Sequence, residues 1–370
     1  MSRRQGVVLP PLLAFLAGNA VSPWSVGAQA AQEIRRPQYC DCELRLEHVV
    51  DLGDTAGPGA FPGIVRSVHR SPDGRYYVLT WNEYLVTRFD SEGRALPPLG
   101  VEGEGPGETL DVATLEFVGD SVVLFDRDLR RITVFDERMT PVRTAAIPGR
   151  MERAVAVEGI GFVLNGRFPT RPNAPLHVLA SSGDYVRSFA EQGEIGPHDP
   201  GSVWWRSVAV TDEGVWAVHQ TRYVLDLWTL EGEHVRTLER VEEWFPPLRN
   251  YSWGGPDDPI DPKVLDLAVD VGGYLRTVIL RPSAYWAERL PEPRSNLVGQ
   301  AVYPIPDGIG LFAATLEVID PRSARLIVST DFELEIRGFA DPEHVFSYAE
   351  DEIGNPTVSI WRVRLASRVP

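Results

Sequence analysis

Three arginines occupy matching positions in a repeated strand-and-turn motif, and arginines repeated in this way suggest an anion-binding site. Arg66, Arg153 and Arg206 each stand at the start of a short apolar run that ends in a glycine turn. If these runs surround one axis, three guanidinium groups point toward the same end of it. Guanidinium forks suit carboxylate or phosphate groups. Asp266, at the neighbouring position of another copy, completes the candidate set.

The alternative interpretation is structural, because an arginine on a strand can also pair with a carboxylate of the next repeat. The candidate partners in neighbouring copies are Glu116, Glu158 and Asp266.

Aromatic side chains form a second group that could recognise a ligand. The sequence has ten tryptophans, and several lie between residues 204 and 253. Trp244 and Trp253 fall in a Pro-rich stretch, residues 242–262, and are the best placed for exposure. Exposed aromatic rings can stack on a sugar or a peptide. The alternative is that these rings pack between repeats.

Evidence for catalysis or metal binding is weaker. His69 and His344 are expected in adjacent repeats, where Asp266 or Glu350 could complete a metal site or an acid/base cluster. A single histidine on a strand more often has a structural role. The sequence shows no nucleophile elbow and no metalloprotease motif. Lys263 is the only lysine, so a Schiff-base mechanism would have to use it. No cofactor motif is evident.

The repeats themselves predict the fold. The strand-and-turn motif recurs six times, and a β-rich run follows each copy, at residues 66–74, 113–120, 153–161, 206–214, 265–273 and 346–354. Two such runs joined by a Gly/Asp turn indicate a hairpin. A second alternating pair follows five of the copies, at residues 85–96, 131–144, 176–189, 224–238 and 316–329. Four antiparallel strands per repeat are the unit of a propeller blade.

The two ends of the chain are expected to close the ring. The sixth repeat supplies only two clear strands, whereas residues 43–53 form an isolated β-like run. Pairing of that run with residues 358–365 would cover an exposed strand edge. We therefore predict an all-β, six-bladed β-propeller in a single domain, residues 43–370. Two insertions, residues 242–262 and 281–308, lengthen the fourth and fifth repeats.

The N-terminal residues have the pattern of an export signal. Arg3 and Arg4 precede an apolar stretch, and Ala28-Gln29-Ala30 fits a cleavage site, so residues 1–30 are interpreted as a signal peptide. We expect an exported protein, periplasmic or extracellular, with no membrane span after cleavage. In the following segment, residues 31–42, Cys40 and Cys42 could form a strained disulfide, make an intermolecular contact, or serve a redox or metal role.

The net charge of −16 argues against nucleic acid and anionic lipid as partners. Binding to phosphate backbones needs clustered Lys and Arg, which an acidic surface does not provide. An anionic ligand would need a local cluster of basic side chains.

The blade motif also resembles a known family. An S/A-V-x-x-x-x-D/E-G turn, followed by YVL and RFDSEGR, is similar to the NHL-type six-bladed propellers, particularly the secreted bacterial members. The linker GVEGEGPGE, residues 100–108, is similar to a linker of that subgroup. The resemblance implies the propeller fold and a binding scaffold, occasionally an enzyme.

Two functional hypotheses follow. The first is a binding or scaffolding propeller that holds a small anionic ligand, a glycan or a protein partner over one face. The alternative is a propeller-type lyase or lactonase that would use His69, His344, Asp266 and Glu350 at the channel mouth.

Overall fold

The computed structural model describes residues 30–36, 41–54, 56–191, 205–246, 255–295, 301–303, 310–351 and 354–367. The chain divides into two compact units, Met1–Ala30 and Ala31–Pro370. Of the predicted signal peptide only Ala30 is described, so that assignment stays a prediction.

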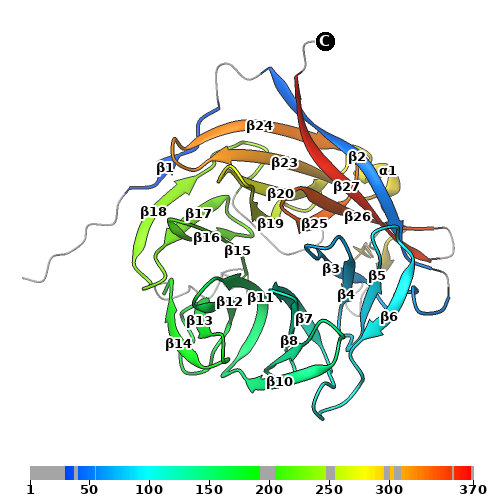
Figure 1. Cartoon of the computed structure of the whole chain (residues 1–370). Coiled ribbons are helices and arrows are strands. Elements are labelled where there is room, and N and C mark those ends of the chain that lie inside the picture. The colour runs from blue at the N-terminus through cyan, green and yellow to red at the C-terminus, as the bar shows by residue number, and fades with distance from the viewer. Residues whose placement is uncertain are drawn as a thin grey trace, which may run out of the picture. The chain divides into compact units, whose positions relative to one another are not determined.

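Six small antiparallel sheets form the blades of a propeller, as predicted (Figure 1). The inner strands of successive blades contact one another around the axis, and the last contacts the first. Blades one to three comprise β3 (Val65–Arg70), β4 (Tyr76–Thr80), β5 (Val86–Phe89) and β6 (Ala95–Leu99); β7 (Val112–Val118), β8 (Ser121–Asp126), β9 (Arg131–Phe135) and β10 (Pro141–Ala146); and β11 (Arg150–Val157), β12 (Gly161–Arg167), β13 (Leu176–Ala180) and β14 (Tyr185–Phe189).

Blades four to six repeat the pattern from inner to outer strand. They comprise β15 (Arg206–Thr211), β16 (Gly214–His219), β17 (Val224–Trp228) and β18 (His234–Glu239); β19 (Lys263–Val269), β20 (Leu275–Pro282), β23 (Phe312–Asp320) and β24 (Arg325–Phe332); and β25 (Ile336–Asp341), β26 (His344–Glu350), β27 (Pro356–Ser367) and β2 (Cys42–Leu52).

The hydrophobic core lies between adjacent blades. Apolar side chains alternate along each strand, so both faces of a blade present them to its neighbours. Between blades two and three, the rings of Phe125 and Phe162 meet edge to face with centroids 5.1 Å apart, and Ile132 and Leu164 are buried in the same cluster. Each blade is therefore stabilised by the next one around the ring.

The two ends of the chain close the ring, as expected. β2 pairs antiparallel with β27, and Leu44 lies opposite Leu365. One expectation about blade six was wrong. Residues 346–354 were assigned to the innermost hairpin, but β25 is the inner strand and β26 lies outside it. The turn between them contains no glycine; instead the Asp341 carboxylate accepts the backbone N–H groups of Glu343 and His344.

A short N-terminal segment adds a contact that the repeats did not predict. β1 (Gln32–Glu33) pairs in parallel with β18 and makes blade four five-stranded. The side chain of Ile34, only 1% exposed, enters the core between blades four and five, and Arg35 bridges to Arg325 of blade five. Residues 32–35 thus join two neighbouring blades from the outside.

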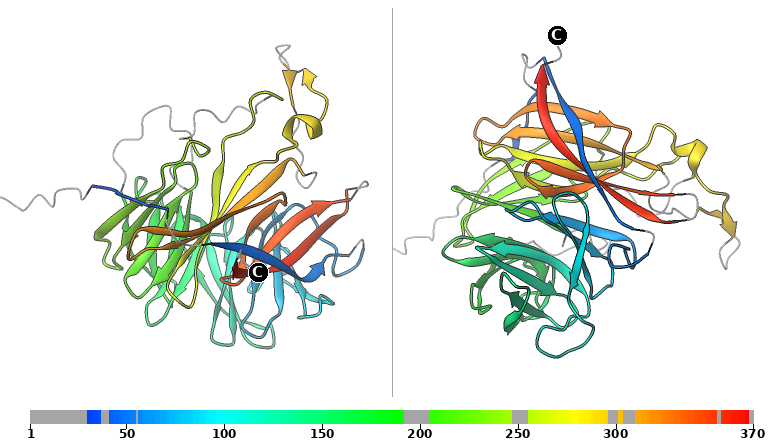
Figure 2. Two further views of the ribbon diagram at one scale, coloured as in Figure 1. Left: turned by 90° about the horizontal axis from the view of Figure 1, so that it is seen from above. Right: turned by 45° about the vertical axis from the view of Figure 1, so that its right-hand side comes forward.

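Both predicted insertions begin on the same side of the ring. The second one, between β20 and β23, contains α1 (Trp286–Arg289) and a two-stranded ribbon, β21 (Arg294–Ser295) with β22 (Ala301–Val302). Figure 2 shows this segment standing out from one side of the blades. None of the helices in the described residues is long and apolar enough to cross a membrane.

Candidate functional site

The inner strands share an irregularity at one end of the channel. The pairing register breaks in five of them, at Arg66, Ala113, Glu152, Leu265 and Arg337, whereas β15 pairs without a break. A β-bulge of this kind bends the strand and re-aims its side chain, and bulges are common beside functional sites. The bulges form the wall of what we call the channel mouth.

A cavity of about 230 Å³ opens at the channel mouth. Basic side chains from five of the six blades line it; Glu335 is the only acidic residue among its lining residues. The basic side chains are Arg66, Arg153, Arg206, Lys263 and Arg337. Trp81 and Trp205 lie at the same cavity, with ring centroids 6.4 Å apart. The structure therefore brings the three predicted arginines into one site.

Arg66 is held between a carboxylate and a tryptophan ring. Its side chain is 6% exposed, pairs with Glu152 at 2.8 Å, and lies over the Trp81 ring at 4.3 Å. Burial, opposed by the charge of Glu152, lowers the pKa of Arg66 to about 10, and the positive charges of Arg127 and Arg153 add to this. Its Nη1 atom has no hydrogen-bond partner among the described residues. An anion at the mouth would stabilise this charge.

Arg153 and Asp266 form a linked pair across the channel. The Arg153 guanidinium lies 3.6 Å from the Asp266 carboxylate and donates a hydrogen bond to the carbonyl of Leu265 at 3.3 Å. Asp266 also accepts the backbone N–H of Phe339 at 2.9 Å, which ties blade five to blade six. Asp266 therefore positions Arg153 beside the cavity and is not among the residues that line it.

Arg206 and Arg337 complete the basic wall. Arg206 is buried and donates to the backbone carbonyl of Trp205 at 3.0 Å. Arg337 pairs with Glu335 at 2.6 Å and lies over the Tyr348 ring at 4.4 Å. The structural interpretation thus holds in part, since carboxylates pair with Arg66, Arg153 and Arg337. The partner of Arg66, however, is Glu152 and not one of the residues proposed from the sequence.

Lys263, the only lysine of the sequence, also lines the cavity. Burial lowers the pKa of its ammonium group, while the charge of Asp261 acts in the opposite direction. The cavity therefore holds one amine whose reactivity can report on its contents.

The predicted histidine and carboxylate cluster does not form. His69 lies on β3, where burial and the charges of Arg153 and Arg66 lower its pKa to about 3. His344 lies on β26, not on an inner strand, and its Nδ1 is 2.8 Å from Asp341. Glu350 accepts the Tyr348 hydroxyl at 2.5 Å. Within the described part of the chain, no three His, Cys, Asp or Glu side chains are grouped to hold a metal.

The remaining candidates lie elsewhere. Trp244 is half-buried against the core between blades four and five, where its ring meets Phe245 edge to face. Trp253 and Cys40 lie outside the described residues. Cys42 is part of a disulfide. The pairing of Cys42 with Cys40, the only other cysteine, stays a prediction.

Two contributors to the cavity, Arg337 and Trp81, were not predicted from the sequence. Arg337 was missed because the inner strand of blade six was misplaced; the run IRGFADPEHVF, with its Asp-Pro-Glu turn, was the available signal. Trp81 follows the second strand of blade one and pairs its backbone N–H with Ile64. It reaches the mouth only because successive strands reverse direction, which places the end of β4 beside the start of β3.

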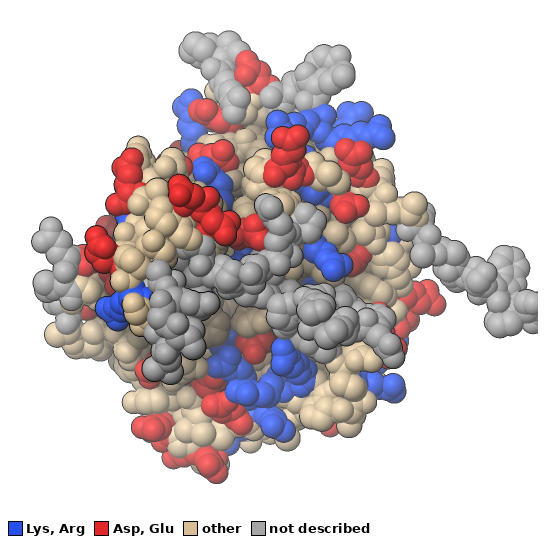
Figure 3. All heavy atoms as spheres, turned by 180° about the vertical axis from the view of Figure 1, so that it is seen from behind, with Lys and Arg blue, Asp and Glu red and all other residues tan. Residues whose placement is uncertain are grey.

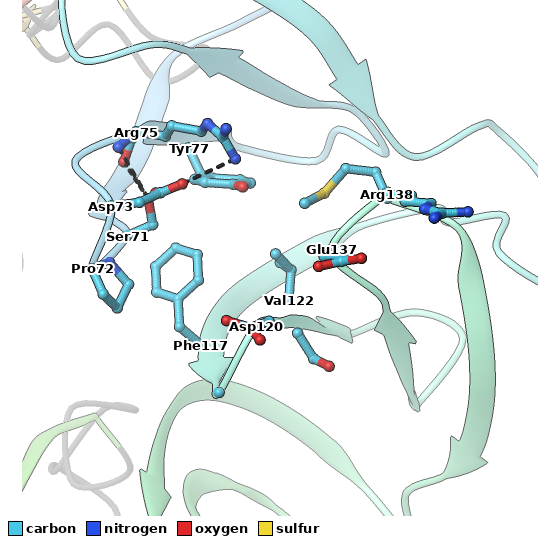
Figure 4. A pocket seen from close by; sticks show the side chains of 13 residues that line it. Ser71, Pro72, Asp73, Arg75, Tyr77, Phe117, Asp120, Val122, Glu137 and Arg138 are labelled. Atoms are coloured by element: carbon cyan, nitrogen blue, oxygen red, sulfur yellow. Dashed lines mark hydrogen bonds and ion pairs between the residues drawn. The ribbon is translucent and has the colours of Figure 1, made fainter.

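A larger hollow, of about 370 Å³, lies between blades one and two at the opposite end of the strands (Figure 4). Its charges are mixed and partly paired, as for Asp73 and Arg75 at 3.0 Å. The matching turns of blades four and five enclose a similar hollow of about 270 Å³. Because the hollow recurs with the repeat, we attribute it to blade geometry and not to ligand recognition.

Comparison with known proteins agrees on the fold. No protein-family model matches the sequence, and no curated protein shows sequence similarity to it. A putative exported protein from Bacteroides fragilis is 10% identical, with a TM-score of 0.55 over 90% of this chain and 99% of that one. A duf4221 family member from Bacteroides vulgatus is 9% identical, with a TM-score of 0.57 over 88% and 99%. Virginiamycin B lyase from Staphylococcus aureus aligns more loosely, at 11% identity and a TM-score of 0.49 over 86% and 99%.

These similarities, together with the six blades, define the class of protein: the chain is a six-bladed β-propeller. At about one residue in ten identical, the solved structures bear on the fold alone, because unrelated functions occur on the same propeller scaffold.

Proposed function

We propose that this propeller is an exported binding protein that holds an anionic ligand in the cavity at the channel mouth. The observation that carries the proposal is the convergence of Arg66, Arg153, Arg206, Lys263 and Arg337 on one cavity. These side chains come from five different blades of a chain with a net charge of −16. Glu152, Asp266 and Glu335 offset part of this positive charge, and an anion in the cavity would offset more of it.

The chemistry of the cavity favours a carboxylate or phosphate attached to a ring or an apolar group. Guanidinium forks bind such anions with two parallel hydrogen bonds. Trp81 is partly exposed at the rim and, with Trp205, offers ring surface for stacking. Export and an NHL-type origin of the blades belong to the same proposal, supported by the N-terminal pattern and the blade motif.

We do not extend the proposal to a lyase or lactonase. The four groups on which that activity would depend hold separate contacts: His344 with Asp341, Glu350 with Tyr348, and Asp266 with Arg153. His69 contacts the hydroxyl of Ser67 at 3.1 Å.

Labelling of Lys263 tests the proposal directly. Because the sequence has one lysine, an amine-selective reagent followed by peptide mapping reports on the cavity without interference from other side chains. We expect galacturonate, citrate or inorganic phosphate to slow the labelling of Lys263. Replacing Arg153 with Gln should weaken this protection by about tenfold, the value of one charge-assisted hydrogen bond.

The matched control is Arg75→Gln, which removes a guanidinium from the hollow at the opposite end of the strands. It should leave the protection of Lys263 unchanged. If no anion slows the labelling, or if Arg75→Gln weakens protection as much as Arg153→Gln, the proposed site is wrong.

A further inference from the structure

A second basic hollow, of about 310 Å³, lies over blades two and three. Arg130, Arg150 and Arg167 line it, and Phe168, Pro169 and Pro172 provide its apolar surface. Arg130 follows β8, Arg150 begins β11, and Arg167 ends β12. We call this feature the satellite hollow.

The satellite hollow opens on the same side of the ring as the channel mouth, because Arg150 begins an inner strand just as Arg206 and Lys263 do. Ion pairs connect the two sites. Glu152 contacts both Arg66 of the mouth and Arg127, at 2.8 and 3.3 Å, and the next residue after Arg127, Asp128, pairs with Arg150. Figure 3 views this face, and Lys and Arg side chains gather in its lower part, over blades two and three.

The satellite hollow is built on a rigid base. The Phe168 ring, 1% exposed, stacks on His177 with centroids 3.7 Å apart and planes within 8°. The carbonyl of Phe168 accepts the N–H of Arg171, which closes the loop on itself. Gly149 allows this approach, because a Cβ there would lie 2.4 Å from both Phe168 and the carbonyl of Arg167. The guanidiniums therefore stand on a preorganised surface.

Arg150 can exchange its carboxylate partner for a ligand at little cost. The ion pair of Arg150 and Asp128 leaves both side chains about half exposed, at 52% and 50%. Exposed pairs of this kind contribute little to stability, so an incoming anion can replace Asp128.

The backbone of this face disfavours an extended peptide as the ligand. The turn before Arg130 satisfies its own N–H groups, because Asp126 accepts those of Asp128 and Leu129. The carbonyl of Arg130 accepts the N–H of Ile147. Among the described residues, the strands of these blades meet this face end-on and present no open edge for β-augmentation. The groups that this hollow offers are guanidiniums and the exposed rings of Pro169 and Pro172, which suit the acidic groups and the C–H faces of sugars.

We propose that the satellite hollow is a second subsite for the ligand of the channel mouth, and that this ligand is an acidic polysaccharide whose carboxylate or sulfate groups reach both sites. This inference rests on the proposed function. It adds that the ligand is a polymer. The affinity would depend on the length of that polymer through contacts with Arg130, Arg150 and Arg167.

Calorimetry with ligands of increasing length tests the inference. We expect oligogalacturonates to bind the full-length protein at least tenfold more tightly than galacturonate itself, since the second subsite adds charge-assisted contacts. The variant Arg130→Gly, Arg150→Gln, Arg167→Gln should bring this ratio close to one. Its fold is expected to persist, because Arg130 has a φ of 49°, which glycine adopts without strain. Arg138→Gln, on a turn at the other end of the strands, is the control and should keep the ratio.

The outcomes separate the two proposals. If galacturonate protects Lys263 but longer oligomers gain no affinity, the satellite subsite is wrong and the channel-mouth site stands. If the triple variant keeps the length-dependent gain, the assignment of these arginines is wrong. Parallel measurements with sulfated oligosaccharides distinguish recognition of sulfate from recognition of carboxylate. Poly-glutamate that binds as tightly, with the same loss in the triple variant, would overturn the glycan class in favour of an acidic peptide.

Discussion

Replacing Glu317 with alanine is expected to lower the free energy of unfolding by about 3 kcal/mol, because it removes one of the two carboxylates that compensate the buried charge of Arg240. Glu317 of blade five is fully buried and accepts hydrogen bonds from Arg240, at 3.4 Å, and from the Tyr223 hydroxyl, at 2.8 Å. Arg240 follows the outer strand of blade four and is 3% exposed. Its remaining carboxylate partner would be Glu242.

Urea unfolding followed by tryptophan fluorescence measures this effect. Glu242→Ala is the comparison variant: Glu242 also pairs with Arg240 but keeps some contact with solvent and with Arg36, and we expect its loss to cost less, about 2 kcal/mol. Removing both buried charges, in Glu317→Leu with Arg240→Met, should recover much of the loss, since no unpaired charge is left. If the free energy of unfolding of Glu317→Ala is within about 1 kcal/mol of the wild-type value, the network does not join blades four and five as described.

The blade pattern could be predicted from the sequence because it depends on local signals. Alternating strands and Gly turns define hairpins, and an unpaired run at each end of the chain predicts the closing pair of β2 and β27. The alignment of inner strands also places Arg66, Arg153 and Arg206 at one end of the channel, where the structure has them.

The details of the site depend on pairing that a single sequence does not reveal. The bulge of β3 falls at Arg66, whereas the bulge of β11 falls at Glu152, one residue before Arg153. Glu152 therefore occupies the position equivalent to Arg66, and the two side chains pair. Arg337 was missed because Asp341, in place of a glycine, shapes the turn that ends its strand. The sequence analysis likewise placed Trp244 at an exposed site because it treated the insertion as free of the core.

Glu116 is expected to make the protein less stable as the pH rises from about 4.5 to about 8. This carboxyl group lies on the inner strand β7, and burial raises its pKa to about 8 from an ordinary value of 4.5; the N–H of Ala156, at 3.3 Å, only partly opposes the shift. Between these values the unfolded chain has released the proton that the folded protein retains. The free energy of unfolding therefore falls with pH in this interval, by up to about 1.4 kcal/mol per unit, and the effect of this group levels off above pH 8.

Glu116→Gln removes the titration but keeps an oxygen that can accept the Ala156 N–H. Below pH 4.5 the variant and the wild type should be equally stable, because both side chains are neutral. At pH 8 the variant should be more stable by about 4 kcal/mol. The control is Glu137→Gln, which removes an exposed carboxyl from the turn between β9 and β10 of the same blade. It accounts for the general loss of negative charge on an acidic protein. A stability difference between Glu116→Gln and wild type that stays constant from pH 4 to pH 8 would mean that the pKa of Glu116 is the same in the folded and the unfolded chain, and the prediction would be wrong.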